Sequence, residues 1–400
     1  SGCWDVAAAP HWRADRPLEE ALDIRANVVA LLREEPDHLL HRVLAAAGDI
    51  EKANTPAAGT LGRLAERLDA GIVGGVATLT PLLTDRGRLK LTGYAQRSLA
   101  EGSVMDMESA RLLLVGFEEM PAFHAETAVQ AIAGLAEGTL KGRVESVARD
   151  YVSLSTGGGL SPFAVARLFE KPETLERVID ALRALVAKYR PTHLALPAVL
   201  GAEDGAPAVR AIREATGLAA FELVPHSPSV PGLRLHRAIE RALDAAGIVR
   251  IAGEAVGART ANGRVDALRV TRNGAEEPVA AKAVVLAGGK FLGGGIRKDR
   301  AFSEPVFDLP VYYRNRRLGA VYSGRLLGAN PGARHPLFSV GLRVDDAFRP
   351  LDEGGAAAYE NLFAAGWILG GYDFIRDGAG LGLAAVTGAL AGRGAREAAA

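Results

Sequence analysis

The chain has 400 residues, a length that predicts two or three domains or one large α/β core with an inserted lobe, and its 48% hydrophobic and 24% charged residues are typical of a folded protein. Its 47 basic residues balance 47 acidic ones, so no overall charge favours binding to nucleic acid or to an anionic membrane. The single cysteine, Cys3, excludes an internal disulfide and fits a reducing compartment, and no stretch reaches the roughly eighteen uncharged apolar residues of a membrane span.

The first 110 residues predict helices followed by a hairpin. Asp15 and Pro17 are typical of a helix cap and first turn, and an amphipathic run follows to about Glu35, with more helix after it. Residues 75–93 then alternate like two strands around a turn at Asp85–Gly87.

Residues 111–225 predict a compact lobe in which strands and helices alternate. The predicted elements, in chain order, are strand 111–117, a helix opened by Pro121 and running to about Glu137, extended chain 144–156, a long helix from Pro172, strand 192–200, helix 206–216 and strand 219–225. This β-α-β-α-β-α-β order predicts a parallel sheet with right-handed crossovers.

After residue 225 a helix begins at Pro231 and is stopped by Gly247. Two Asn-Gly turns follow, at Asn262 and Asn273. Both residue types tolerate the positive φ of a type I′ turn, so a three-stranded antiparallel meander is expected over 248–280.

Three glycine-rich segments compete as a cofactor cradle. The first, Ser155–Gly159, is followed by Leu160, Ser161 and Pro162 where a helix should present its N–H groups, and a flexible connection is favoured there. The second is AVVLAGGKFLGGGI (283–296), in which Ala283–Ala287 predict a buried strand and two glycines form its exit, the position where open α/β proteins bind a cofactor.

The third segment runs from ENLFAAGWILGG (360–371) to a closing helix expected over Gly378–Gly392. A flavin gains negative charge on reduction, so a helix N-terminus aimed at it would stabilise the reduced form. Close helix–strand packing also demands glycine and remains the alternative interpretation. The residues expected to contact a cofactor in the last two segments are Gly288, Gly289, Lys290, Gly366, Gly370, Gly371, Gly378 and Gly380. Lys290 is the best single candidate because the fold fixes its backbone position.

Several stretches together carry a family resemblance. THLALPAVLGAEDG, VPHSPSVPGLRLHRAIERAL, the meander, AVVLAGGKFLGGGI and ENLFAAGWILGGYDFIRDGAGLGLAAVTGAL resemble the corresponding stretches of the B-type subunit of anaerobic glycerol-3-phosphate dehydrogenase, a flavoprotein of the wider fumarate-reductase-like group. The similarity is strongest over about 192–300 and 357–390 and fainter before 110. Family members begin with a strand and a G-x-G-x-x-G turn. Here Ser1-Gly2-Cys3-Trp4-Asp5 resembles their later Ser-Gly loop, so Ser1 and Gly2 are further expected cofactor contacts. The missing first unit indicates either a fragment or a protein that has lost this pyrophosphate-binding unit; a fragment is favoured, because removing a central parallel strand would expose the apolar faces of its neighbours.

The resemblance implies oxidation of sn-glycerol 3-phosphate to dihydroxyacetone phosphate. Electrons would leave through a flavin, FMN in the family's B-type subunit with FAD as the alternative, and pass to a membrane-attached iron–sulfur subunit and then to quinone. An A-type flavoprotein sister subunit is the implied catalytic partner. The implied location is cytoplasmic, peripheral at the inner face of the membrane through a partner.

A flavin dehydrogenase needs a base for the alcohol proton and cations for the substrate phosphate. His226 and Arg234 are weak candidates for binding substrate, and His335 is a further one, although a structural or solvated role competes for each. A locally basic stretch, Arg297 to Arg317, could hold phosphate or dock an acidic partner, and a solvated face is the default interpretation. No catalytic residue is assigned, and eight scattered histidines match no metal-site spacing.

The resulting expectation is an α/β flavoprotein. Residues 1–110 are the remainder of the N-terminal flavin-binding segment with a helical and strand region, 111–225 an inserted α/β lobe, and 226–400 the C-terminal part of the flavin-binding domain. Two other functions stay open: a non-catalytic scaffold or electron-relay subunit of the same complex, and another fumarate-reductase-like flavin oxidoreductase.

Overall fold

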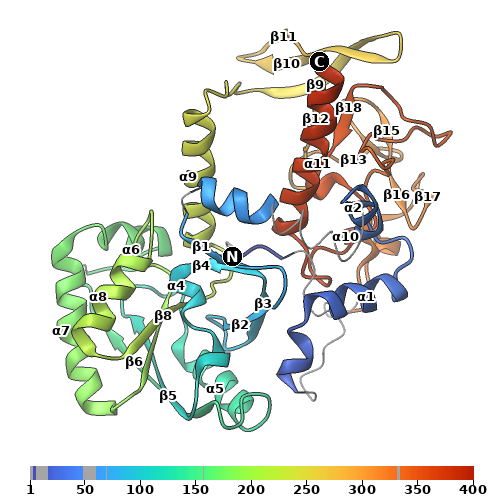
Figure 1. Cartoon of the computed structure of the whole chain (residues 1–400). Helices are drawn as coiled ribbons and strands as arrows, with labels where there is room; N and C mark the ends of the chain where they lie inside the picture. Colours follow the sequence, from blue (N-terminus) through green and yellow to red (C-terminus); the bar gives the residue numbers. More distant parts are fainter. Residues whose placement is uncertain (1–2, 6–16, 48–59, 69, 156, 331–333) are drawn as a thin grey trace. The chain divides into compact units, whose positions relative to one another are not determined.

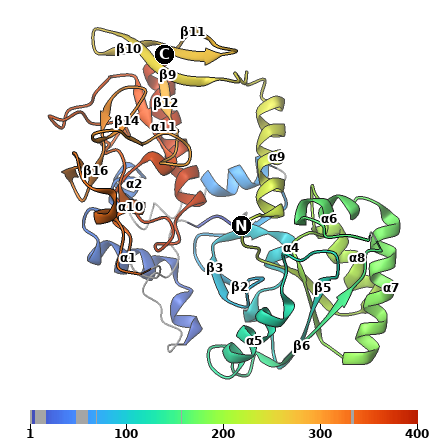
Figure 2. The same cartoon turned by 180° about the vertical axis from the view of Figure 1, so that it is seen from behind.

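The computed structural model describes residues 3–5, 17–47, 60–68, 70–155, 157–330 and 334–400. The chain divides into two compact units, labelled by element in Figures 1 and 2. Unit 1 is Ser1–Trp4, Trp12–Ile24 and Gly62–Ile248, and unit 2 is Asp5–His11, Arg25–Leu61 and Val249–Ala400.

The core of unit 1 is a four-stranded parallel sheet. Its strand order is β6 (Val144–Val152), β5 (Ala110–Phe117), β7 (His193–Pro197) and β8 (Ala219–Leu223). Central β5 is apolar and buried along nearly its whole length, as expected of a parallel strand that is covered on both faces. The predicted parallel lobe is confirmed.

Five helices belong to this part of unit 1: α5 (Ala125–Ala136), α6 (Pro162–Leu168), α7 (Pro172–Tyr189), α8 (Ala206–Thr216) and α9 (Val230–Ala245). The predicted start of α5 at Pro121 was wrong. Two turns precede the helix instead, because the Phe117 carbonyl accepts the Met120 N–H and the Met120 carbonyl accepts the Phe123 N–H. The short helix α6 was not expected. Ser161 caps it by accepting a hydrogen bond from the Ala164 N–H, and Pro162 begins it, so the cap signal was present in the sequence.

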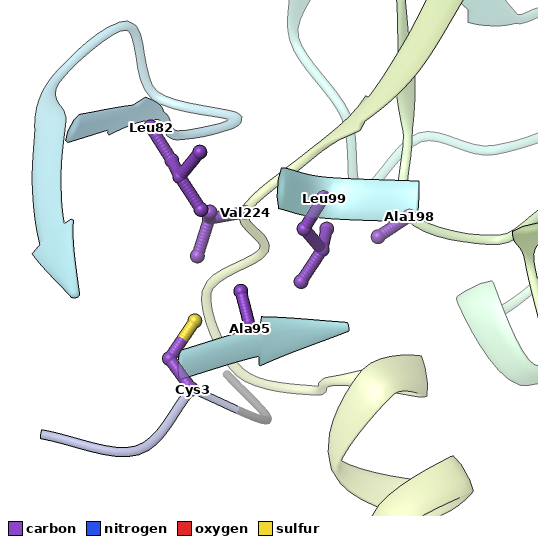
Figure 3. Packing of buried hydrophobic residues seen from close by; sticks show 6 residues of the cluster. All are labelled: Cys3, Leu82, Ala95, Leu99, Ala198 and Val224. Carbon is purple, nitrogen blue, oxygen red and sulfur yellow. The ribbon is translucent and has the colours of Figure 1, made fainter. Parts of the chain in front are cut away.

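A hairpin in unit 1, β2 (Thr80–Leu83) and β3 (Leu89–Thr92), turns at the predicted place. Strands β1 (Ile72–Gly74) and β4 (Tyr94–Gln96) pair beside it, followed by α4 (Arg97–Ala100) and η2 (Val104–Asp106). A buried cluster holds these pieces to the sheet, and Figure 3 shows its side chains gathered together: Cys3, Leu82, Ala95, Leu99, Ala198 and Val224.

The N-terminal helices are shorter than the pattern predicted. The expected cap at Asp15 lies outside the described residues, and Pro17 precedes a single 3-10 turn, η1 (Leu18–Ala21). Helices α1 (Ile24–Glu34) and α2 (Leu40–Ala47) follow, and residues 60–68 are helical.

Unit 2 contains the predicted meander of β9 (Glu254–Ala261), β10 (Arg264–Arg272) and β11 (Ala275–Ala280), paired antiparallel with β10 in the middle. Both Asn-Gly turns have positive φ at both residues, as the type I′ geometry requires. Asn361 joins the meander to the next strand, since its side-chain amide donates to the Val265 and Lys282 carbonyls and accepts from the Val265 N–H.

The rest of unit 2 is built around two short parallel strands, β12 (Val284–Leu286) and β18 (Leu362–Ala364), and a long helix, α11 (Leu381–Ala399). Figure 2 shows α11 running beside β12. The strand predicted within Ala283–Ala287 is present as β12, but it is buried only in part, because Val284 and Leu286 are buried while Val285 between them is 38% exposed. The closing helix begins three residues later than predicted and runs seven residues further. The remaining small elements are β13 (Arg297–Lys298), β14 (Phe302–Glu304), β15 (Leu309–Pro310), β16 (Tyr312–Tyr313), β17 (Arg316–Arg317), η3 (Ser323–Leu326), α10 (Pro336–Ser339) and η4 (Gly366–Ile368).

Of the helices in the described part of the chain, none combines the length and the apolarity that crossing a bilayer requires.

Candidate functional site

The two glycine exits of unit 2 lie beside each other. Strands β12 and β18 are parallel neighbours with Leu286 opposite Ala364, and the Ala365 N–H donates to the Leu286 carbonyl at 3.0 Å. Gly288 and Gly366 therefore follow adjacent strands at the carboxyl edge of one sheet. In open α/β proteins this edge is where ligands bind.

The loop after β12 folds back on itself, and this explains its glycines. A Cβ on Gly293 would lie 2.5 Å from the Gly288 carbonyl oxygen, and one on Gly295 would overlap the Gly289 carbonyl oxygen. Gly289 also has a φ of +70°. Close backbone packing accounts for Gly293 and Gly295 without a ligand.

The turn after β18 differs, because space remains beside it. Gly366 has a φ of +73°, and its N–H donates to the Thr387 hydroxyl at 3.0 Å. The atom nearest to a Cβ there would be Ala384 Cβ at 3.8 Å, an ordinary contact. Left-handed backbone rather than crowding thus requires this glycine.

Gly370 and Gly371 do not share that open space. A Cβ on Gly370 would lie 3.0 Å from the Gly341 nitrogen, and one on Gly371 would lie 2.9 Å from the Asp37 carbonyl oxygen. The structure places these two glycines where backbone segments cross, which favours the packing interpretation for them.

Helix α11 begins at the same edge, packed against β12, β18 and η4. Its cap residue, Gly380, supplies no side-chain hydrogen bond, and its carbonyl accepts the Ala384 N–H within the helix. The N–H groups of the first turn have no acceptor within the helix, so this end carries partial positive charge. Gly378, expected to open the helix, instead lies in the preceding turn with a φ of +58°.

The N-terminal loop was also expected here. Ser1 and Gly2 lie outside the described residues, but Asp5 is described and buried. A Cβ on Gly382 would lie 2.5 Å from the Asp5 carbonyl oxygen, so the Asp5 backbone packs tightly against the first turn of α11.

Lys290 turns its ammonium into unit 2 rather than towards solvent, and the residue is only 7% exposed. Nζ donates to the Phe338 carbonyl at 2.5 Å and lies 5.3 Å from the centre of the Tyr372 ring. Desolvation by burial lowers the pKa of Lys290 to about 7, although the charge of nearby Asp373 opposes this. A buried amine that titrates near neutrality is typical of functional sites.

A second polar group lies next to Tyr372. His38 is buried, makes an edge-on contact with the Tyr372 ring, and its Nε2 lies 3.2 Å from Asp377 Oδ2. The same oxygen accepts the Asp373 N–H at 2.7 Å, and Arg334 pairs with Asp377 Oδ1 at 3.6 Å and with Glu35. This group could not be found from the sequence, since no local pattern connects His38 with a residue 339 positions away.

The two weak substrate candidates, His226 and Arg234, lie in unit 1. Arg234 is 1% exposed, with NH1 and NH2 2.7 and 3.0 Å from the two Glu222 oxygens and Nε donating to the Gly201 carbonyl. Burial raises the pKa of Glu222, but the Arg234 charge and hydrogen bonds from Arg234, Ser98 and Leu200 together hold it below its ordinary value. The structure thus gives Arg234 a buried structural partner. His226 is partly exposed, and its Nδ1 lies 2.6 Å from Asp85 Oδ2.

The other candidates have ordinary surroundings. Arg297 and Arg317 of the basic stretch are exposed and pair with Glu254 and Glu353, which agrees with a solvated face. His335 precedes α10, and its Nδ1 accepts the Gly328 N–H. Within the described ranges, no group of three or more histidine, cysteine, aspartate or glutamate side chains is placed to hold a metal ion.

Comparison with known proteins identifies the class first. Residues 27–383 match the family described as "FAD binding domain". The chain therefore belongs to the class of flavoproteins with this domain, and the expected α/β flavoprotein fold is confirmed.

A narrower family follows from individual relatives. One is the probable B-type subunit of anaerobic glycerol-3-phosphate dehydrogenase from Halobacterium salinarum (strain ATCC 29341 / DSM 671 / R1). The chain is 35% identical to it over 325 residues, covering 79% of this chain and 73% of that protein. The present chain therefore belongs to the B-type subunit family of anaerobic glycerol-3-phosphate dehydrogenase, as the resemblance predicted. A Yersinia pseudotuberculosis relative described as the same kind of subunit is 32% identical over 222 residues, or 55% of this chain and 49% of that one. A relative from Vibrio cholerae described as the same kind of subunit is 28% identical over 226 residues, which cover 56% of this chain and 50% of that protein. No solved structure matches the chain.

Proposed function

We propose that this chain is the flavin-dependent subunit of a glycerol-3-phosphate dehydrogenase that oxidises sn-glycerol 3-phosphate to dihydroxyacetone phosphate. The observation that carries the proposal is the parallel pairing of β12 with β18, which puts two glycine exits and the start of α11 at one sheet edge. Membership of the FAD binding domain family and of the B-type family supports the same conclusion.

The residues at this edge fit a flavin. Ala287 and Gly288 are exposed, and a Cβ on Gly366 or on Gly380 would have no neighbour nearer than 3.8 or 3.9 Å. Backbone at these positions is free to approach a flat ring. The residues proposed to hold the flavin are Gly288, Gly289, Lys290, Gly366 and Gly380, with Gly378 in the turn before the helix. When bound, a flavin supplies a two-electron acceptor for the alcohol carbon.

The protein's own contribution is electrostatic and positional. The first turn of α11 directs its N–H groups and the positive end of its dipole to this edge, and the buried Lys290 amine, which follows the β12 exit, adds positive charge when it is protonated. Both favour negative charge at the edge. Thr387 fixes the turn, because its hydroxyl accepts the Gly366 N–H and donates back to the Leu383 carbonyl at 2.8 Å.

An aromatic pair borders the same edge. The Trp367 and Phe374 rings stack with centres 4.8 Å apart and 12° between their planes, and Trp367 Nε1 donates to the Gly380 carbonyl. This stack ties η4 to the turn before α11.

The finer parts of the proposal concern identity and assembly. We propose FMN as the flavin with FAD as the alternative, an A-type flavoprotein sister and a membrane-attached iron–sulfur subunit as partners, quinone as the final acceptor, and a cytoplasmic location at the inner membrane face. We also propose that residues 111–225 are a lobe inserted between the parts of the flavin-binding domain. The relatives are themselves named as subunits, which supports a complex of several chains.

The test is direct. The purified chain, incubated with FMN or FAD and freed of excess ligand, should show a flavin absorbance spectrum, and chromatography of the extracted cofactor identifies which flavin is bound. Gly366→Val should abolish retention, because a β-branched residue does not adopt the left-handed backbone there, while Gly388→Ala on the open side of α11 should retain it. Circular dichroism confirms that both variants are folded.

A colourless wild-type protein with both flavins would overturn the proposal. Flavin bound but never reduced by glycerol 3-phosphate in the assembled complex would instead indicate the relay or scaffold role, and reduction by other hydroxy acids would indicate a different oxidoreductase of the same fold.

A further inference from the structure

The parallel sheet of unit 1 has its own topological switch point. From β5 the chain passes to β6 on one side and then returns to β7 on the other side of β5, so the strand order reverses between β5 and β7. In open parallel sheets, loops at the carboxyl ends diverge at such a point and leave a crevice where ligands bind.

A small cavity lies at this place. Its walls come from the chain just after three strands: Met120 and Phe123 after β5, Val199 after β7, and Pro225 and His226 after β8. Asp85, from the turn of the β2–β3 hairpin, completes it. Most of the lining is apolar, and among the described residues that line it there is no lysine or arginine.

The fold holds Asp85 and His226 together. The Val224 N–H donates to the Leu83 carbonyl at 2.9 Å and the Asp85 N–H donates to the Val224 carbonyl at 3.0 Å, which joins the hairpin to the end of β8. Leu82 and Val224 pack in the buried cluster behind this junction (Figure 3). Asp85 Oδ2 then accepts both the backbone N–H of His226 at 3.2 Å and its ring at Nδ1.

One oxygen of this carboxylate has no partner. Asp85 Oδ1 is buried and accepts no hydrogen bond from the described residues, the sole such buried side-chain atom among them. A buried acceptor left without a donor costs free energy, so the fold is expected to provide one from a bound molecule.

The contact with Asp85 involves one of the two ring nitrogens of His226. A carboxylate oxygen accepts, so the short contact at Oδ2 uses a proton on Nδ1 and leaves Nε2 outside this hydrogen bond. His226 is partly exposed, with 36% of its side-chain surface accessible. The cavity is thus lined by a carboxylate with one unpartnered oxygen, Oδ1, and by an imidazole whose Nε2 is outside the Asp85 contact, beside apolar walls.

We propose that this cavity is a binding site for a small neutral diol. One hydroxyl group would donate to Asp85 Oδ1, a neighbouring hydroxyl group would form a hydrogen bond with His226 Nε2, and the carbon skeleton would lie against Phe123 and the proline-rich wall. An anion is disfavoured because the lining holds a carboxylate and no basic side chain other than the imidazole. The proposal does not rest on the flavin site, which belongs to unit 2.

The experiment uses the full chain labelled with ¹³C at histidine, with the His226 resonance identified by its loss in His226→Gln. Glycerol should shift this resonance saturably. Asp85→Asn should weaken glycerol binding about tenfold or more, as expected for the loss of a charged hydrogen-bond acceptor. 1-Propanol, with a single hydroxyl group, should bind more weakly than glycerol, and His236→Gln, an exposed histidine on α9, is the matched control that should bind as the wild type does.

No shift with glycerol would overturn the proposal, as would a linear shift equal in the wild type and Asp85→Asn. Saturable binding of inorganic phosphate, with no binding of glycerol, would overturn the proposal that the ligand is neutral. If Asp85→Asn does not fold, the saturation-transfer signal of glycerol is compared between the wild type and His226→Gln. Equal signals would contradict binding at this site. None of these outcomes bears on the flavin absorbance test.

Discussion

At the scale of single residues, Lys290 gives the most specific prediction. Burial holds its pKa at about 7, whereas the same side chain titrates near 10.5 in the unfolded chain. Between these values the unfolded state binds one more proton than the folded state, so the free energy of unfolding should rise with pH from 7 to about 10. The slope from this group is up to about 1.4 kcal/mol per pH unit.

Lys290→Met removes this contribution. Urea unfolding at pH 7, 8 and 9 should show the wild type gaining stability relative to the variant as pH rises. Lys298→Met, at an exposed lysine of β13, should follow the wild-type curve. Parallel curves for wild type and Lys290→Met would contradict the assignment.

Residue type alone did not separate the two substrate candidates. Arg234 and His226 looked equivalent in the sequence, one within a helix and one before it. The structure buries Arg234 against Glu222 and leaves His226 partly exposed on a cavity, because the partner of each residue comes from a strand or turn elsewhere in the chain.

At the scale of elements, two glycines of α11 should respond oppositely to the same substitution. Gly382 faces the Asp5 backbone, so the added methyl group of Gly382→Ala has no space and should cost roughly 1–3 kcal/mol. Gly388 has nothing within 4 Å of an added Cβ, and Gly388→Ala should stabilise by up to about 1 kcal/mol through helix propensity. Thermal or urea unfolding of both variants checks this, and equal effects would mean that the Asp5 backbone does not pack on α11.

The sequence predicted the boundaries of an element correctly where residues at that boundary themselves restrict the backbone angles. The helix at 206–216 and the two Asn-Gly turns lie where the pattern placed them, because proline, glycine and asparagine fix backbone angles by themselves. The start of α5 and the length of α11 were wrong, since neighbouring turns and packing decide how far a helix runs.

At the scale of the whole molecule, we expect flavin to stabilise one unit of the two. Binding stabilises the folded form by about 2.7 kcal/mol when the free ligand is at 100 times its dissociation constant. Hydrogen exchange with and without flavin should therefore show slower exchange over 284–296 and 362–384. The strands of the unit 1 sheet should be unchanged, and protection confined to 110–223 would place the flavin elsewhere.

The sequence by itself determined the class of fold, the meander, the parallel lobe and the family, because each depends on periodicity, turn residues or an ordered series of motifs. Only the tertiary structure decided which glycines have open space, which cations are buried and which histidine faces a cavity. The reason is physical. Gly288 and Gly366 are brought together by strand pairing, and Asp85 reaches His226 across 141 positions, so these environments are created by contacts between distant segments that no local pattern encodes.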